Sequence, residues 1–212
     1  MFRPQTNNRP NAFAPVGRFV NYLHEFNIDM KENLDGLKLV PLQEEDRVNF
    51  IYDNQRAFKY GALEEFGVRD DHFEDDDEII SSDTIERSID GEHAETFRIV
   101  LNEEIVGGLV LSIDKETQKG ELELLFVNPH VHSKGIGQAA WQAVERMHPE
   151  IKIWETITPY FEKRNIHFYV NRCGFHIVEY WNKYFHGKSI PNEEEGNWGE
   201  DDEMFLFRKT IE

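Results

Sequence analysis

A short loop with two closely spaced glycines, Gly135 and Gly137, is the segment of this sequence best suited to bind an anion. It follows an apolar stretch that ends at Val127 and precedes residues 138–147, where apolar side chains recur at helical spacing. The first backbone N–H groups of a helix have no acceptor within the helix and carry the positive end of its dipole. Glycine has no Cβ, so a ligand can approach these groups closely. The sequence therefore predicts a strand, a loop and a helix that bind a phosphate or pyrophosphate.

The spacing of this loop differs from that of two common nucleotide-binding loops, since neither GxGxxG nor GxxxxGK[ST] matches it. The segment FVNPHVHSKGIG resembles instead motif A of the GCN5-related N-acetyltransferases (GNAT), V-x-P-x-x-[Q/R]-x-x-G-x-[G/A]. Val127, Pro129, Gly135 and Gly137 match, and His132 stands where the family usually has Gln or Arg. The resemblance implies that the amides of this loop bind the pyrophosphate of acetyl-CoA.

A second segment, NIHFYVNRCGF at residues 165–175, resembles motif B of the same family, N-x-x-A-x-x-[L/F]-Y-x-K-x-G-F. There the Asn binds the cofactor and the Tyr protonates the departing thiolate of CoA, which implies these roles for Asn165 and Tyr169. The match is incomplete. Four residues rather than three separate Tyr169 from Gly174, and Asn165 precedes Tyr169 by four positions rather than seven. Asn165 and Tyr169 still share one helical face. The alternative for Tyr169 is a packed aromatic with a satisfied hydroxyl.

Acetyl transfer from a thioester to an amine needs a neutral amine, a donor for the oxyanion and a proton for the sulfur. Glu121 and Glu123 alternate with Leu122 and Leu124 along an expected strand, so both carboxyl groups are predicted on one face. Either can accept the amine proton directly or through water. Alternatively, both are outward residues of a half-exposed strand.

The resemblance implies acetyl-CoA as acyl donor and direct transfer in a ternary complex to a primary amine, which is a small cationic metabolite or a peptide amine. It places the backbone N–H groups of Leu125 and Phe126 at the thioester carbonyl, where strands four and five splay. The implied cofactor-binding residues are Leu125, Phe126, Val127, His132, Ser133, Lys134, Gly135, Ile136, Gly137, Gln138 and Asn165. No ligand spacing such as HExxH is present, so no metal is predicted.

The formal net charge is −18, from 23 basic and 41 acidic residues. Such a field disfavours nucleic acid and anionic membranes and favours cationic acceptors; alternatively, it only keeps the protein soluble. Cys173 is the only cysteine, which excludes an internal disulfide and a cysteine-based metal cluster. No apolar run is long enough to span a membrane, so we expect a cytoplasmic protein.

The resemblance implies a mixed α/β (α+β) fold in one domain, with a mostly antiparallel sheet splayed between strands 4 and 5 and flanked by helices. Residues 37–212 are predicted to form this acetyltransferase domain, and residues 1–36 an N-terminal appendage. Strands are expected at 37–41, 96–101, 105–113, 120–127, 151–156, 175–181 and 204–207. Helices are expected at 44–62, 79–89, 138–147 and 158–172.

Two of the expected helices carry further detail. In the first, Val48, Ile51, Tyr52, Gln55 and Phe58 are predicted to trace one face. In the last, Thr158 is predicted as the N-cap, Pro159 as the first helical residue and Gly174 as the stop.

Two other functional classes remain open at this point. The chain can be a non-catalytic acyl-CoA-binding sensor that keeps motif A, or an interaction protein whose acidic segments bind a basic partner. A homodimer is also compatible with the sequence.

Overall fold

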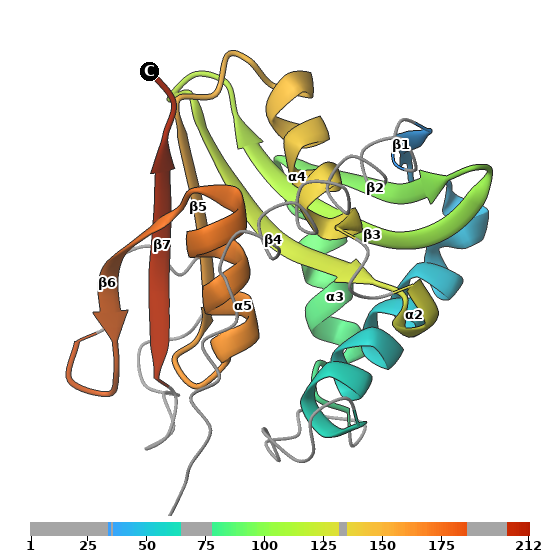
Figure 1. The fold of residues 1–212 in the computed structure, drawn as a ribbon, viewed down its shortest axis with the longest axis horizontal. Helices are drawn as coiled ribbons and strands as arrows, with labels where there is room; N and C mark the ends of the chain where they lie inside the picture. The colour runs from blue at the N-terminus through green and yellow to red at the C-terminus, as the bar shows by residue number, and fades with distance from the viewer. Residues whose placement is uncertain (1–33, 35, 65–77, 132–134, 186–202) are drawn as a thin grey trace, which may run out of the picture. The chain divides into compact units, whose positions relative to one another are not determined.

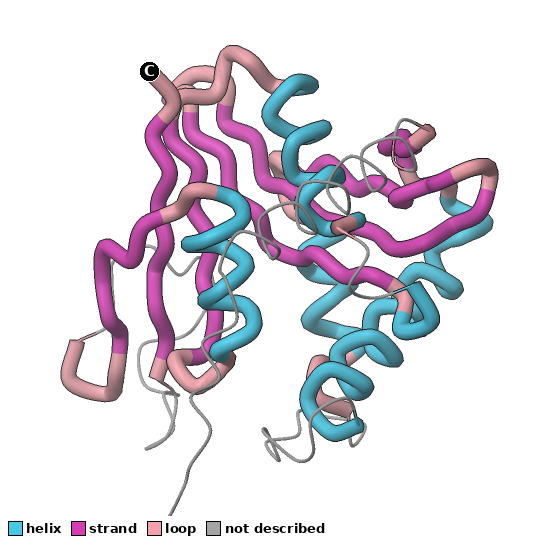
Figure 2. Tube along the Cα trace, in the orientation of Figure 1, coloured by secondary structure: helices cyan, strands magenta, loops and turns pink. Residues whose placement is uncertain are grey.

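The computed structural model describes residue 34 and residues 36–64, 78–131, 135–185 and 203–212. Residues Gly36–Glu212 form one unit, built on a seven-stranded sheet of order β1-β2-β3-β4-β5-β7-β6 (Figures 1 and 2). The strands are β1 (Leu37–Pro41), β2 (Ala94–Leu101), β3 (Glu104–Asp114), β4 (Lys119–Val127), β5 (Ile153–Pro159), β6 (His176–Trp181) and β7 (Met204–Thr210). The predicted appendage, residues 1–36, lies outside the described residues except for Leu34 and Gly36, so it stays a prediction.

Tight turns join β2, β3 and β4 into an antiparallel meander. Asn102 and Glu103 have positive φ angles, 51° and 70°, as a two-residue hairpin turn requires. Asp114 begins the next turn, where its Oδ1 accepts the backbone N–H groups of Glu116 and Thr117 at 2.9 and 3.1 Å. Local polar residues in the two turns therefore set the order of β2 to β4, whose strands correspond to three that the sequence predicted.

The sheet opens between β4 and β5. These two strands are parallel and pair only at Lys119–Ile153, Gly120–Trp154 and Glu121–Glu155. Beyond that point β5 continues along β7 to the pair Pro159–Met204, whereas β4 stays with β3 and diverges from β5 (Figure 1). The mostly antiparallel sheet, splayed between strands four and five, is the one predicted.

A β-bulge sits in β4 just beyond the last of these pairs. Leu122 pairs with Leu111 and Leu124 pairs with Val110, so Glu123 is an extra residue in β4. A bulge bends its strand and re-aims the neighbouring side chains. It therefore interrupts the alternation of β4 at the point where the sheet opens.

Helices α2 (Arg47–Lys59) and α3 (Ser82–Ile89) lie on the opposite face of the sheet from α4 and α5 (Figure 1). A 3-10 turn at Glu44–Asp46 precedes α2, and a π turn at Tyr60–Glu64 follows it. Ser81 caps α3 by accepting the Thr84 N–H at 3.1 Å. These elements correspond to the first two predicted helices.

The predicted face of α2 is only partly correct, because Ile51 is buried and Phe58 packs against the core, but two other members are exposed. Val48 and Tyr52 are 77% and 62% exposed, whereas the helix buries Phe50, Ile51, Asn54 and Ala57. The buried stripe has the expected 3.6-residue period, but a polar residue, Asn54, stands in its centre. The apolar pattern alone therefore indicated a face rotated away from the real one.

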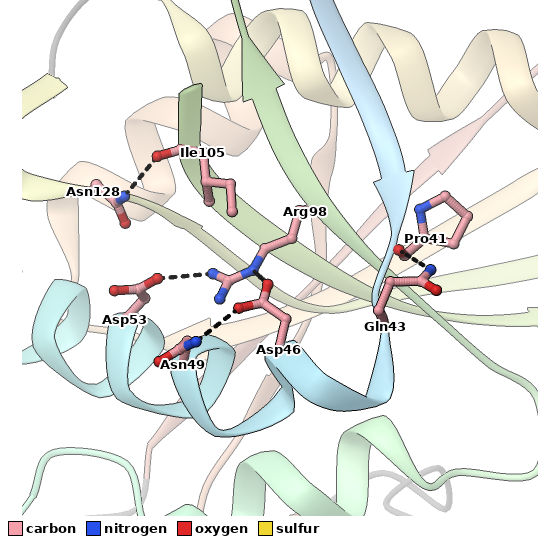
Figure 3. Close-up of polar contacts among 8 residues, drawn as sticks. All are labelled: Pro41, Gln43, Asp46, Asn49, Asp53, Arg98, Ile105 and Asn128. Carbon is pink, nitrogen blue, oxygen red and sulfur yellow. Dashed lines mark hydrogen bonds and ion pairs between the residues drawn. The ribbon is translucent and has the colours of Figure 1, made fainter. Parts of the chain in front are cut away.

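A buried ion-pair network joins the start of α2 to β2 (Figure 3). Arg98 is 4% exposed and donates from Nε to Asp46 at 2.6 Å and from Nη1 to Asp53 at 2.9 Å. Its guanidinium also lies 5.1 Å from the centre of the Phe50 ring. The Arg98 hydrogen bond holds the pKa of Asp46 below its usual value. The charge of the buried guanidinium is thus compensated by two carboxylates, and these contacts hold α2 against the sheet.

Helices α4 (Ile136–Met147) and α5 (Lys163–His167) cover the other face, and α5 continues into a π turn at Phe168–Cys173. Trp141 of α4 packs edge-on against Trp154 of β5, with ring centres 5.1 Å apart. The predicted N-cap at Thr158 and helical Pro159 are wrong, because both residues still belong to β5 and pair with β7. Four residues beyond Pro159, Lys163 begins the helix.

Candidate active site

The start of α4 has the conformation that the glycine loop predicted. Gly135 is the N-cap in the left-handed region, with φ 78° and ψ 5°. The Ala139 N–H donates to the Gly135 carbonyl at 3.0 Å, so the N–H groups of Ile136, Gly137 and Gln138 precede the first helical hydrogen bond. The Ile136 side chain is buried, which leaves only its backbone for an anion. The predicted cofactor residues His132, Ser133 and Lys134 lie outside the described residues.

The second glycine of the loop is also closely packed. A Cβ on Gly137 would lie 3.3 Å from Cε2 of Phe168 and 3.9 Å from Cγ2 of Val127. The Gln138 side chain also reaches the π turn, since Nε2 donates to the Arg172 carbonyl at 2.9 Å. Its backbone N–H is thus the part of Gln138 left for the predicted cofactor contact.

Of the two predicted oxyanion donors, the geometry favours Leu125. The Asn128 N–H donates to the Val106 carbonyl at 2.8 Å, and hydrogen-bonded pairs alternate along an antiparallel ladder. The Phe126 N–H therefore faces β3, whereas the Leu125 N–H faces the side from which β5 has diverged. Phe126 contributes a buried ring, packed edge-on against Phe50 at 5.2 Å.

Glu121 points to the face of the sheet that carries α3. A Cβ on the preceding residue, Gly120, would fall 2.4 Å from the ring of Trp154, which packs on α4. The next residue along a strand points the opposite way, so Glu121 faces away from α4. Burial raises the pKa of Glu121 to about 7, and the charges of Glu123 and Glu155 add to this effect.

The two neighbouring carboxyl groups have partners that Glu121 lacks. Arg208 donates to Glu155 at 2.6 Å, and Ser88 of α3 is a hydrogen-bond partner of Glu123. Burial raises the pKa of Glu123, and the Ser88 bond partly offsets that. Within the described part of the chain, the Glu121 carboxyl has no hydrogen bond or ion pair. It is therefore the carboxyl best placed to take up a proton.

The sequence predicted Glu121 and Glu123 on one face of β4 and two leucines, Leu122 and Leu124, on the other. This alternation holds only up to the bulge. Leu124 packs in the core formed by α2 and α3, on the face where Glu123 meets Ser88. The extra residue in β4 brings Glu123 and Leu124 to the same side.

Tyr169 lies on the α5 face of the opening. Its ring packs against Phe175 and Phe207, with centres 5.8 and 5.4 Å away. Burial raises the pKa of its hydroxyl to about 12, although a hydrogen bond with the Thr156 side chain lowers it in part. At neutral pH Tyr169 therefore carries a proton that it can donate.

The π turn explains why motif B contains one residue too many. The N–H groups of both Gly174 and Phe175 point to the Tyr169 carbonyl, so the helix ends with wide turns. Gly174 has φ 79° and ends the helix in the left-handed conformation, as predicted. The additional residue is accommodated by this wider turn.

Asn165 and Tyr169, which were predicted to share one helical face, both lie beside β5. The Asn165 Nδ2 donates to Thr158 Oγ1 at 3.2 Å, and Tyr169 meets Thr156 two residues earlier on the same face of the strand. The contact of Asn165 in the described structure is thus with the protein, and its cofactor role stays a prediction.

Comparison with known proteins agrees with this arrangement. Residues 49–175 match the family described as Acetyltransferase (GNAT) family. The chain belongs to this family. It is 38% identical over 172 residues to the uncharacterized protein YrkN of Bacillus subtilis, a match that covers 80% of this chain and 90% of YrkN.

Two solved structures show the same GNAT fold. The first is a GNAT acetyltransferase from Elizabethkingia anophelis with acetyl-CoA bound, with TM-score 0.56, 18% identity and coverage of 84% of this chain and 99% of that one. The second is the spermidine N-acetyltransferase of Vibrio cholerae in complex with CoA and spermine, with TM-score 0.56, 14% identity and coverage of 82% and 95%. The predicted family and fold are confirmed, and acetyl-CoA as the expected acyl donor agrees with these findings.

Sequence reasoning missed four residues that lie beside the predicted catalytic side chains, namely Ser88, Glu155, Thr156 and Arg208. Each acts through a contact between elements distant in sequence, such as the 2.6 Å bond from Arg208 to Glu155. One signal was available in the sequence. Thr156 is a polar residue two positions after Trp154, so alternation along β5 places it on the same buried face.

Proposed function

We propose that this chain is an N-acetyltransferase that transfers the acetyl group of acetyl-CoA to a primary amine by direct attack in a ternary complex. One observation carries the proposal: an unpaired carboxyl and a protonated phenol lie on opposite faces of the point where β4 and β5 separate. Glu121 forms the last pair with Glu155, and the next residue of β5, Thr156, contacts Tyr169. A base and an acid at one opening suit proton removal from the amine and proton delivery to the sulfur.

The proposal assigns roles to the α4 N-terminus, Leu125, Glu121 and Tyr169. The N–H groups at the start of α4 bind the pyrophosphate, and the Leu125 N–H donates to the oxyanion that forms on the thioester carbonyl. Glu121 accepts the proton of the attacking amine. The C–S bond then breaks, and Tyr169 gives its proton to the sulfur. Water restores the proton of Tyr169 and removes that of Glu121, so no further reactant is consumed.

The acceptor in this proposal is cationic, either a small metabolite or a peptide amine. Glu121 and Glu123 lie on the face that carries α3, beside Glu155, which is paired with Arg208, within a chain of net charge −18. Such a field attracts cations and raises their local concentration. The co-crystallised spermine of the Vibrio cholerae enzyme supports the same class of acceptor.

The second candidate is an acyl-CoA-binding sensor, which needs the α4 N-terminus but neither acid nor base. The raised pKa of Glu121 favours the enzyme, because an unpaired, half-buried carboxyl lowers stability and perturbed carboxyl groups of this kind cluster at catalytic sites.

The location and the partners are separate questions. None of the helices among the described residues is long and apolar enough to cross a membrane. A cytoplasmic location, a homodimer and the absence of a nucleic-acid partner stay predictions.

The deciding experiment measures CoA release from acetyl-CoA with a panel of polyamines, amino acids, peptides and neutral amines. Mass spectrometry of the acceptor identifies an added acetyl group. We expect turnover with at least one cationic amine. Calorimetric binding of acetyl-CoA without turnover on any amine would instead identify a sensor.

A further inference from the structure

Thr156 occupies the vertex of the opening between β4 and β5. This residue is 1% exposed and directly follows Glu155, whose pair with Glu121 is the last between these strands. The Thr156 hydroxyl donates to the Leu122 carbonyl at 2.8 Å. A side chain thus makes the hydrogen bond between β4 and β5 where their pairing has ended.

The same hydroxyl is the hydrogen-bond partner of Tyr169. A hydroxyl has one hydrogen to donate and two positions to accept. Since the hydrogen of Thr156 is directed to Leu122, its oxygen keeps two positions that can accept a hydrogen from the Tyr169 hydroxyl. The Tyr169 ring packs against Phe175 and Phe207, and Phe207 of β7 is the strand partner of Thr156.

We infer that Thr156 is a positioning residue for Tyr169, which holds the tyrosine hydroxyl at the opening and stabilises the phenolate left after proton transfer. The inference rests on the proposed function. In the transfer step the O–H bond of Tyr169 breaks, an S–H bond forms on CoA, and the Tyr169 oxygen becomes negative. The Thr156 hydrogen then turns from the Leu122 carbonyl to that oxygen, and water later returns the proton to Tyr169.

The gain from this bond is greater after proton transfer than before it. Burial raises the pKa of Tyr169 to about 12, so the phenolate is costly at this position. A hydrogen bond to a charged oxygen is roughly twice as strong as one between neutral groups. An interaction that strengthens as charge develops lowers the barrier of the step rather than only improving binding.

The kinetic test compares Thr156→Val, which keeps the shape and removes the hydroxyl, with Thr156→Ser, which keeps the hydroxyl. We expect Thr156→Val to lower kcat about 10-fold with little change in the KM for acetyl-CoA, and Thr156→Ser to retain most activity. Thr156→Ala serves as the second hydroxyl-free variant where Thr156→Val folds poorly. In a Tyr169→Phe background, loss of the hydroxyl should have no further effect on kcat. An equal loss in both backgrounds would show a purely structural role and overturn the inference.

A second readout does not depend on turnover. The protein is labelled with 3-fluorotyrosine, and the ¹⁹F NMR resonance of residue 169 is identified by its absence in Tyr169→Phe. Its titration midpoint should lie at higher pH in Thr156→Val than in the wild type and in Thr156→Ser. A shifted midpoint in a protein that acetylates no amine would refute the proposed function but leave the Thr156 contact standing. Equal midpoints in all three proteins would refute the contact itself.

Discussion

On the two faces of the sheet at the opening, burial raises the pKa of a catalytic candidate, but the consequences for base and acid strength are opposite. Burial raises the pKa of Glu121 to about 7 on the α3 face and that of Tyr169 to about 12 on the α5 face. It makes Glu121 a stronger base near neutral pH, but it makes Tyr169 a weaker acid. Correspondingly, within the described residues Glu121 has no hydrogen-bond partner, whereas Tyr169 has Thr156. A carboxyl becomes a stronger base when it lacks hydrogen-bond partners, whereas a desolvated phenol needs a partner that stabilises its anion.

The largest expected effect is on the acid side. Tyr169→Phe removes the proton donor and keeps the ring that packs on Phe175 and Phe207. We expect kcat to fall about 10²- to 10⁴-fold while acetyl-CoA affinity is nearly unchanged. Steady-state kinetics and calorimetric titration measure the two quantities. Full activity in Tyr169→Phe would assign the acid role to water or another residue.

On the base side, Glu121→Gln should lower kcat/KM about 10²-fold, with Glu123→Gln as the matched control on the same face. Glu123 already has Ser88 as partner, so its loss is expected to cost less. In the wild type kcat/KM should rise as pH passes about 7, where Glu121 loses its proton. In Glu121→Gln that inflection should disappear, and higher pH should restore part of the activity by supplying more neutral amine. A larger loss in Glu123→Gln would exchange the two assignments.

The same comparison shows what the sequence could reveal. The opening after strand four was implied by the resemblance to the GNAT family. The strands β2 to β4 and the stop at Gly174 follow from local patterns: turn residues, alternation and a glycine that adopts positive φ. The glycine loop was predicted for the same reason, since Gly135 acts through its own backbone.

The errors arise where tertiary packing decides. Asn54 is buried in the middle of the α2 stripe, so its polarity concealed the face that packs. Pairing with β7 extends β5 through Thr158 and Pro159, which locally resemble a helix start. The bulge at Glu123 and the contact of Thr156 with Tyr169 depend on neighbouring elements, and no spacing within one segment encodes them.

The pH dependence of the free energy of unfolding tests the desolvation of Glu121 independently of activity. Its pKa is raised above the usual value of 4.5, so the folded state binds this proton more tightly than the unfolded state. Stability from this group is therefore present below about pH 4.5 and is lost as pH rises to about 7. Glu121→Gln should exceed the wild type by up to about 3 kcal/mol at about pH 9 and match it at about pH 4. Urea unfolding at both pH values measures this, and equal stability at high pH would mean that Glu121 is solvated.

The smallest expected effect separates donor binding from both acid and base. Gly135 has φ 78°, where an alanine costs about 1–2 kcal/mol and shifts the first amides of α4. Gly135→Ala should therefore weaken acetyl-CoA binding about 10-fold in calorimetric titration. Gly91→Ala is the control, because its Cβ would meet neighbours at ordinary distances of 3.5 Å or more. Saturating acetyl-CoA should restore kcat in Gly135→Ala, whereas neither Tyr169→Phe nor Glu121→Gln recovers in this way. Unchanged affinity in Gly135→Ala would remove the α4 N-terminus from the binding site and leave the acid and the base without a positioned donor.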